Sequence, residues 1–148
     1  MTLKVDHEIT VNRPAAEVFA YLTSIETLPE WQASVVAARK ETAGPVTAGT
    51  RFVESRRWLG HSVDSTIEVT EHKPAERFTL RVVSGPIPFR VTHALEERNG
   101  STRVHIQGEG EPHGLARMAG GLMARRARQE FETDFGRFKS LLESRPRA

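Results

Sequence analysis

The chain has no cysteine among its 148 residues, so it forms no disulfide bond and has no thiolate for catalysis. It also has no hydrophobic run near the roughly 20 residues that a membrane-spanning helix needs. Residues 1–10 lack the basic start and apolar stretch of a secretory signal. The formal net charge is only +2, so no strong overall field attracts a polyanion. These absences predict a cytoplasmic protein that inserts into no membrane and binds no nucleic acid.

The sequence also lacks the short motifs that bind metals and nucleotides. Its six histidines show neither H-x-x-H nor H-E-x-x-H spacing, so we expect no metal site. There is no phosphate-binding loop, no G-x-G-x-x-G fingerprint and no G-x-S-x-G elbow. We therefore expect no bound cofactor.

Strand-like segments fill most of the chain before residue 112. Residues 3–11 alternate between apolar and polar side chains, which is the period of a half-buried strand. Asn99 and Gly100 form a strong hairpin signal, and the other connections are also short, so neighbouring strands should run antiparallel. Seven strands are expected, at Leu3–Val11, Val35–Thr42, Thr50–Trp58, Ser62–Glu71, Phe78–Ser84, Phe89–Glu97 and Ser101–Glu109.

Two regions have the helical period. The first begins near Pro14, is expected to kink into two short helices, and should end at about Leu28 because Pro29 follows. The second is the amphipathic segment Pro112–Ala148, which must pack its apolar stripe against the sheet. That stripe consists of Leu115, Met118, Leu122, Ala127, Phe131, Phe135, Phe138 and Leu142. The composition and this order of elements predict one α+β domain spanning residues 1–148.

Two consecutive glycines, Gly120 and Gly121, interrupt the last segment. Each costs a helix interior roughly 1 kcal/mol relative to alanine. Two interpretations remain open. Either the helix begins only after Gly121, or the small residues leave room for a ligand and let the helix end move.

Four segments carry a resemblance to a known family. Residues 9–23 (ITVNRPAAEVFAYLT), 28–31 (LPEW), 49–52 (GTRF) and 67–74 (IEVTEHKP) resemble the START/Bet v 1-like (SRPBCC) superfamily, and more narrowly its bacterial polyketide cyclase/dehydrase-type branch. The resemblance implies a helix-grip fold, in which a curved sheet surrounds a long C-terminal helix with an apolar cavity between them. It implies binding of lipids or polyketides, and in some members cyclisation or dehydration, but no catalytic motif that could be transferred to this chain.

Strand parity predicts which residues face that cavity. On the strand at residues 50–58, two large aromatic residues favour the face that also carries Glu54 and Arg56, although both charges could instead face solvent. The predicted lining of the ligand site is Tyr21, Trp31, Phe52, Glu54, Arg56, Trp58, Ser65, Ile67, Leu80, Val82, Val91, His93, Leu115, Met118 and Leu122.

Three of these residues are candidates for catalysis. His93 or Glu54 could act as a general acid or base, and Arg56 could stabilise a developing enolate. The alternative is that His93 is a buried histidine with its hydrogen bonds satisfied, and that Glu54 and Arg56 form a structural ion pair. Binding of a small hydrophobic molecule is the leading hypothesis, and a polyketide cyclase, aromatase or dehydratase is the alternative. A protein-interaction or regulatory module is the second alternative.

The charge is concentrated in the last segment. From Pro112 onward there are eight Lys/Arg and four Asp/Glu, which leaves +4 there and −2 on the rest. The cluster Arg125–Arg128 could contact nucleic acid, anionic lipid or a protein partner, and a homodimer is compatible with the sequence. A solvated helix face, with Arg126 and Glu130 paired, is the favoured interpretation because no aromatic residues alternate with the arginines.

Overall fold

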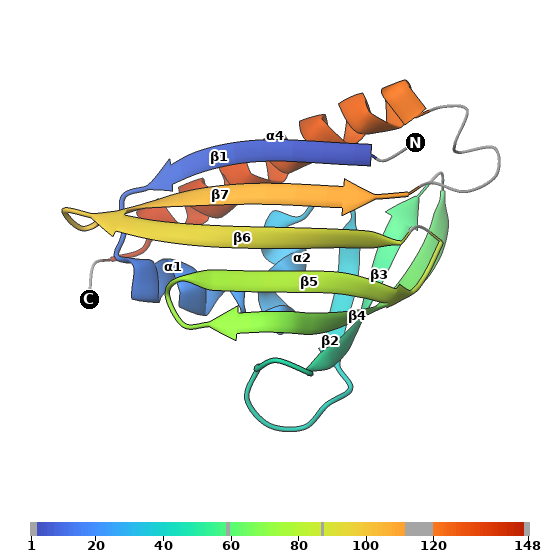
Figure 1. Cartoon of the computed structure of the whole chain (residues 1–148), viewed down its shortest axis with the longest axis horizontal. Coiled ribbons are helices and arrows are strands. Elements are labelled where there is room, and N and C mark those ends of the chain that lie inside the picture. The colour runs from blue at the N-terminus through green and yellow to red at the C-terminus, as the bar shows by residue number, and fades with distance from the viewer. Residues whose placement is uncertain (1–2, 59, 87, 112–119, 147–148) are drawn as a thin grey trace.

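The computed structural model describes residues 3–58, 60–86, 88–111 and 120–146, and its strands form one antiparallel sheet (Figure 1). The strand order is β1-β7-β6-β5-β4-β3-β2, so every pair except β1–β7 joins strands that are consecutive in the chain. This seven-stranded sheet confirms the predicted one. The strands are β1 Leu3–Val11, β2 Val35–Lys40, β3 Arg51–Trp58, β4 His61–Lys73, β5 Arg77–Ser84, β6 Phe89–Arg98 and β7 Ser101–Gly110.

Short helices follow β1 and one long helix follows β7, as predicted. Helix α1 spans Ala15–Leu22, a single 3₁₀ turn spans Ile25–Thr27 and α2 spans Leu28–Trp31. The prediction that Pro29 ends the helical region was wrong, because Pro29 lies in the first turn of α2. A proline is tolerated there since that N–H has no partner within the helix. Helix α4 spans Gly120–Ser144, so its described part includes both glycines.

The C-terminal part of the predicted apolar stripe packs on the concave side of the sheet, where α4 lies (Figure 1), whereas Leu122, which was predicted to belong to the same stripe, is exposed. Phe135, Phe138 and Leu142 are buried there. Trp31 of α2 lies between two of these residues, with ring centroids 5.0 Å from Phe135 and 4.9 Å from Phe138. Tyr21 of α1 stacks on Phe138 at 5.2 Å. The short helices and the C-terminal half of α4 therefore close one end of the sheet with an aromatic core.

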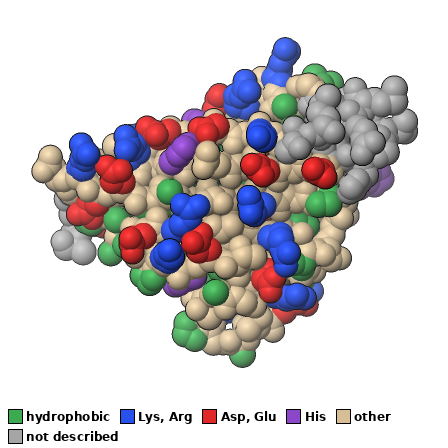
Figure 2. Space-filling view, viewed as in Figure 1, with side chains coloured by type: hydrophobic (Ala, Val, Ile, Leu, Met, Phe, Trp, Pro, Cys, Tyr) green, Lys and Arg blue, Asp and Glu red, His purple; other side chains and the backbone are tan. Residues whose placement is uncertain are grey.

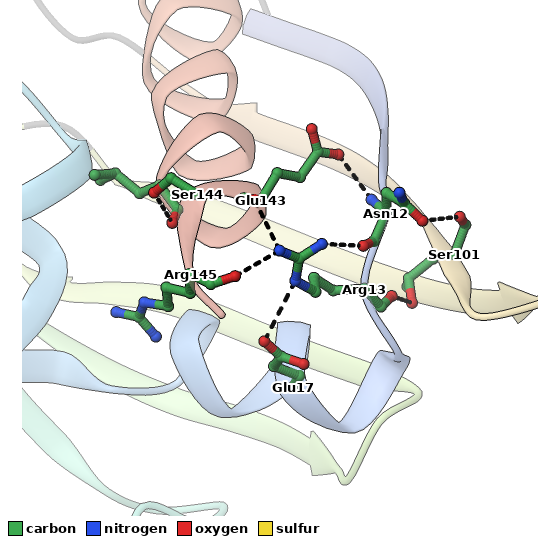
Figure 3. Close-up of polar contacts among 9 residues, drawn as sticks. Asn12, Arg13, Glu17, Ser101, Glu143, Ser144 and Arg145 are labelled. Atoms are coloured by element: carbon green, nitrogen blue, oxygen red, sulfur yellow. Dashed lines mark hydrogen bonds and ion pairs between the residues drawn. The ribbon is translucent and has the colours of Figure 1, made fainter. Parts of the chain in front are cut away.

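Arg13, in the turn between β1 and α1, holds the C-terminal end of α4 (Figure 3). Its guanidinium donates to the carbonyl oxygens of Glu143 at 2.7 Å and Arg145 at 2.6 Å, and to that of Asn12 at 2.7 Å. The side chain is buried, and the carboxylate of Glu17 lies 3.7 Å from its Nε. The last carbonyls of a helix have no partner within the helix, so a cation here satisfies them and complements the helix dipole.

The convex side of the sheet is covered by charged side chains of both signs (Figure 2). Several form cross-strand pairs, such as Arg81–Glu68 at 3.0 Å and Arg103–Glu96 at 3.0 Å. Three of these four side chains are about half exposed, and surface pairs of this kind contribute about 0–1 kcal/mol each. The convex side is therefore a solvated surface, and the concave side is where a ligand site is to be sought.

Candidate functional site

The concave face of the sheet is well buried at one end and only half-buried at the other. Phe52 and Phe78 are 0% and 1% exposed. Leu80, Val82 and Val91 face the same side, but they are only partly covered. Inward-facing apolar side chains are normally covered in a domain of this size, so an accessible apolar wall marks a surface suited to a ligand.

The strand register brings many of the predicted lining residues onto this face. Phe52 pairs with Ile67, and Ile67 pairs with Val82 on the next strand. Leu80 of β5 pairs with Val91 of β6. The wall continues to Phe89, whose ring contacts Phe131 of α4 with centroids 6.3 Å apart.

Gly108 on β7 leaves room for the rings of Phe89 and Phe131. A Cβ atom at Gly108 would lie 2.7 Å from the ring of Phe89 and 3.3 Å from that of Phe131, which is too close for both rings to stay in place. The two phenylalanine rings therefore pack over the backbone of Gly108, which has no side chain, at the half-buried end of the sheet.

Glu54 and Arg56 of β3 lie on the concave side of the sheet, on the same face as the buried Phe52. Glu54 is 5% exposed and lies opposite Ser65 on β4. The guanidinium Nε of Arg56 donates to the Glu54 carboxylate at 2.5 Å. A carboxylate buried at this depth requires a hydrogen-bonded cation, which Arg56 supplies.

Arg56 is also held from the other side. Its Nη1 donates to the Ser34 hydroxyl and its Nη2 to the Gln32 side-chain oxygen, both at 2.6 Å. A guanidinium has five N–H groups, so two of them have no partner among the described residues. The Arg56 side chain is 36% exposed. It is therefore a fixed cation that can still donate to an anionic or carbonyl group of a ligand.

Asp134 of α4 belongs to the same polar region, although it was not among the predicted site residues. It accepts a hydrogen bond from the Ala33 N–H at 3.2 Å and lines an open cleft of about 290 Å³ between α4 and the connection before β2. Burial raises the pKa of the Asp134 carboxyl, and the backbone hydrogen bond and Arg56 act in the opposite direction. One sequence signal could have found it, since Asp134 is an acid beside the apolar stripe, directly before Phe135.

His93 lies on the same face but deeper, and it is 3% exposed. Its Nδ1 is 2.9 Å from the carbonyl oxygen of Phe78. A carbonyl oxygen can only accept, so Nδ1 carries the proton and Nε2 keeps the lone pair. Burial lowers the pKa of His93 from 6.5 to about 4, because desolvation outweighs the hydrogen bond to Phe78. The imidazole is therefore neutral at physiological pH.

Some predicted lining residues do not lie at the half-buried wall. Tyr21 is in the closed core, where its hydroxyl donates to Glu30 at 2.9 Å and the guanidinium of Arg145 lies over its ring. Trp31 is also in that core. Leu122 faces solvent and is 70% exposed. Leu115, Met118 and the side chain of Trp58 lie outside the described part of the structure.

The described residues contain no group of three or more histidine, aspartate or glutamate side chains placed to hold a metal ion. No helix in the described ranges is long and apolar enough to cross a membrane.

The fold and the apolar wall define the class of protein. A seven-stranded antiparallel sheet around a long C-terminal helix, with two short helices after β1, is the Bet v 1-like helix-grip fold. The family model described as polyketide cyclase / dehydrase and lipid transport matches residues 2–143. The chain therefore belongs to this family, as its sequence motifs indicate.

Solved structures share the fold at low sequence identity. The ZhuI aromatase/cyclase from Streptomyces sp. R1128 is 14% identical, with a TM-score of 0.85 over 100% of this chain and 98% of that one. Ara h 8.0201 is 13% identical, with a TM-score of 0.78 over 98% and 100%. A conserved protein from Geobacillus kaustophilus is 17% identical, with a TM-score of 0.78 over 95% of both chains. No curated protein matches the sequence. At these identities the likeness is one of fold alone.

Proposed function

We propose that the chain acts as a single ligand-binding domain that holds a small hydrophobic molecule against the half-buried apolar wall of the sheet. The observation that carries this proposal is the accessibility of Leu80, Val82 and Val91, which face inward and yet are only partly covered. Covering such a surface with an apolar ligand contributes about 25 cal/mol per Å² of apolar area. Membership of a family described by polyketide chemistry and lipid transport supports the same class of ligand.

The ligand should carry one polar or anionic group. Arg56 lies on the wall side of β3, is fixed by Glu54, Ser34 and Gln32, and still has unused donors. A hydrogen bond to a charged donor in a partly desolvated site contributes about 1.5–3 kcal/mol. We therefore assign Arg56 as the polar anchor and the residues of β5 and β6 as the apolar contact surface.

A first test uses 8-anilinonaphthalene-1-sulfonate, a fluorescent probe with an apolar body and an anionic group. We expect it to bind, and we expect Val91→Trp to weaken binding at least about tenfold because the indole occupies the apolar surface. Arg56→Gln should weaken binding by about tenfold because the sulfonate loses its charged donor. Both effects are measured by fluorescence titration.

The matched control is Arg90→Trp, which adds the same indole to the adjacent residue on the convex side of β6. It should leave the affinity unchanged. Equal losses in Val91→Trp and Arg90→Trp, or wild-type protein that does not bind the probe, would contradict the assignment of the site.

A cyclase or dehydratase activity is the second candidate, favoured by the arrangement of His93 and Arg56 on one concave face. A neutral imidazole could take a proton from a carbon next to a carbonyl of the substrate. Arg56 lies on β3, which β4 and β5 separate from β6, so it could hold a distant carbonyl of a long substrate. The low pKa of His93 makes it a weak base near neutral pH, which is why binding is the leading proposal.

This second candidate is tested with a linear poly-β-carbonyl thioester and chromatographic detection of the cyclised product. If the protein cyclises it, His93→Gln should slow the reaction by about a hundredfold, within the range of general acid–base catalysis. The same variant should leave probe affinity nearly unchanged. Turnover that is equal in wild type and His93→Gln would remove His93 from the mechanism.

A further inference from the structure

The first turns of α4 present a surface that the proposed ligand site does not use. Two large hydrophobic residues are exposed in the described part of the chain, and Leu122, at 70%, is more exposed than Val36. Phe131, which contacts Phe89 of the sheet, comes nine residues later. Nine residues make two and a half turns of an α-helix, so Leu122 points away from the sheet. Its exposure therefore follows from the helix geometry and does not depend on a side-chain rotamer.

Two arginines lie beside this leucine. Arg125 and Arg126 follow it by three and four residues, which places them on the same face of the helix. Arg128 is exposed on the flank of the helix, about 120° round from Leu122, from where its long side chain can reach the same surface. Residues 120–129 contain these three arginines and no acid. The nearest acid, Glu130, lies 3.6 Å from Arg126, and both side chains are about half exposed, so the pair is weak. Basic side chains project along the edge of the molecule where α4 lies (Figure 2).

This surface lies at the half-buried end of the sheet. Helix α4 is held by polar contacts towards its other end, where Arg13 binds its last carbonyls (Figure 3). Arg137 also donates to the Glu30 carbonyl at 2.6 Å. Among the described residues, polar contacts from α4 to the rest of the chain begin only at Asp134. The face that carries Leu122 is therefore free to contact a partner without disturbing the core.

We propose that Leu122, Arg125, Arg126 and Arg128 dock the protein on an anionic lipid bilayer. An exposed leucine flanked by arginines matches the chemistry of such an interface, because the arginines contact lipid phosphates while the leucine enters the acyl boundary. A nucleic acid would use the arginines and leave the leucine in water, and the described part of this face has no aromatic side chain for base stacking.

The test is flotation of the full chain with vesicles of phosphatidylcholine alone or with added phosphatidylserine. We expect binding only with phosphatidylserine, and weaker binding as salt is raised. Each arginine near an anionic surface contributes about fivefold, so replacing Arg125, Arg126 and Arg128 together by Gln should lower the partition coefficient by about a hundredfold. Leu122→Ser should lower it by about fivefold through the loss of apolar burial.

The chain offers matched controls on exposed positions. Replacing Arg81, Arg90 and Arg103 on the convex side of the sheet by Gln removes the same charge, and Val36→Ser removes the other exposed hydrophobic side chain. Both controls should retain vesicle binding.

Three results would overturn the proposal. The first is an equal loss of binding in the triple variant of α4 and in the triple variant of the convex side. The others are wild-type protein that does not float with anionic vesicles, and a Leu122→Ser variant that binds as wild type does. Tight binding to a single-stranded oligonucleotide without binding to anionic vesicles would assign the arginines to a nucleic acid instead. None of these variants changes a residue of the proposed ligand site, which has its own test with a soluble probe, so the two proposals can fail separately.

Discussion

Arg13→Ala should lower the free energy of unfolding by about 3 kcal/mol, the largest single-residue effect expected outside the aromatic core. The guanidinium is buried and bonds three backbone carbonyls, two of them at the end of α4. Alanine would leave these carbonyls without a donor in a region that water reaches poorly. Urea unfolding at neutral pH measures the effect. Hydrogen exchange should also speed up in the last turns of α4.

Two variants separate this role from the loss of a positive charge. Arg13→Lys keeps the charge but replaces the planar group by one point donor, so it should recover only part of the stability. Arg98→Ala removes a guanidinium whose side chain is 84% exposed and should change stability by less than about 0.5 kcal/mol. If Arg13→Ala and Arg98→Ala unfold at the same urea concentration, Arg13 does not hold the helix end.

Acidification should destabilise the protein through His93. The pKa of this imidazole is about 4 in the fold and about 6.5 in the unfolded chain, because the folded protein buries it. Below pH 6.5 the unfolded chain gains a proton that the folded protein excludes, so the free energy of unfolding decreases as the pH is lowered. The fall ends near pH 4, where the folded imidazole also protonates. Its size is about 3 kcal/mol.

Unfolding curves measured between pH 7 and pH 4 test this prediction. His93→Gln cannot take up a proton, so the His93 contribution to the pH dependence should disappear even if the variant is less stable at pH 7. His61→Gln, which changes an exposed histidine at the start of β4, should keep the wild-type pH dependence. A pH dependence that is the same in His93→Gln as in wild type would show that other groups cause the acid sensitivity.

The fold was predictable from the sequence because its signals are local. The alternation of Leu3–Val11 and the Asn99–Gly100 turn each specify an element without information from the rest of the chain, and both are confirmed. Pro29 was misread because a proline can either end one helix or begin the next. Only the packing of Leu28 and Trp31 in the core decides between the two.

The site was less predictable because it depends on contacts between distant residues. Strand parity correctly grouped Phe52, Glu54 and Arg56, since parity is a property of one strand. Parity cannot indicate that Gln32 and Ser34 fix Arg56, or that Asp134, far along the chain, joins the same region. The placement of Tyr21 failed for a similar reason, because the stacking of its ring on Phe138 and the contact with Arg145 are tertiary.

The two ends of α4 differ in how firmly they are packed, and this difference has a consequence for how such a protein can evolve. The Arg13 contacts and the aromatic core stabilise one end, whereas Leu80, Val82 and Val91 at the other end are only partly covered and contribute less to folding. Under the proposed function, substitutions on the wall should therefore change which molecule the site accepts at little cost to stability. New ligand preferences could then arise through a series of single mutations, each of which gives a folded protein.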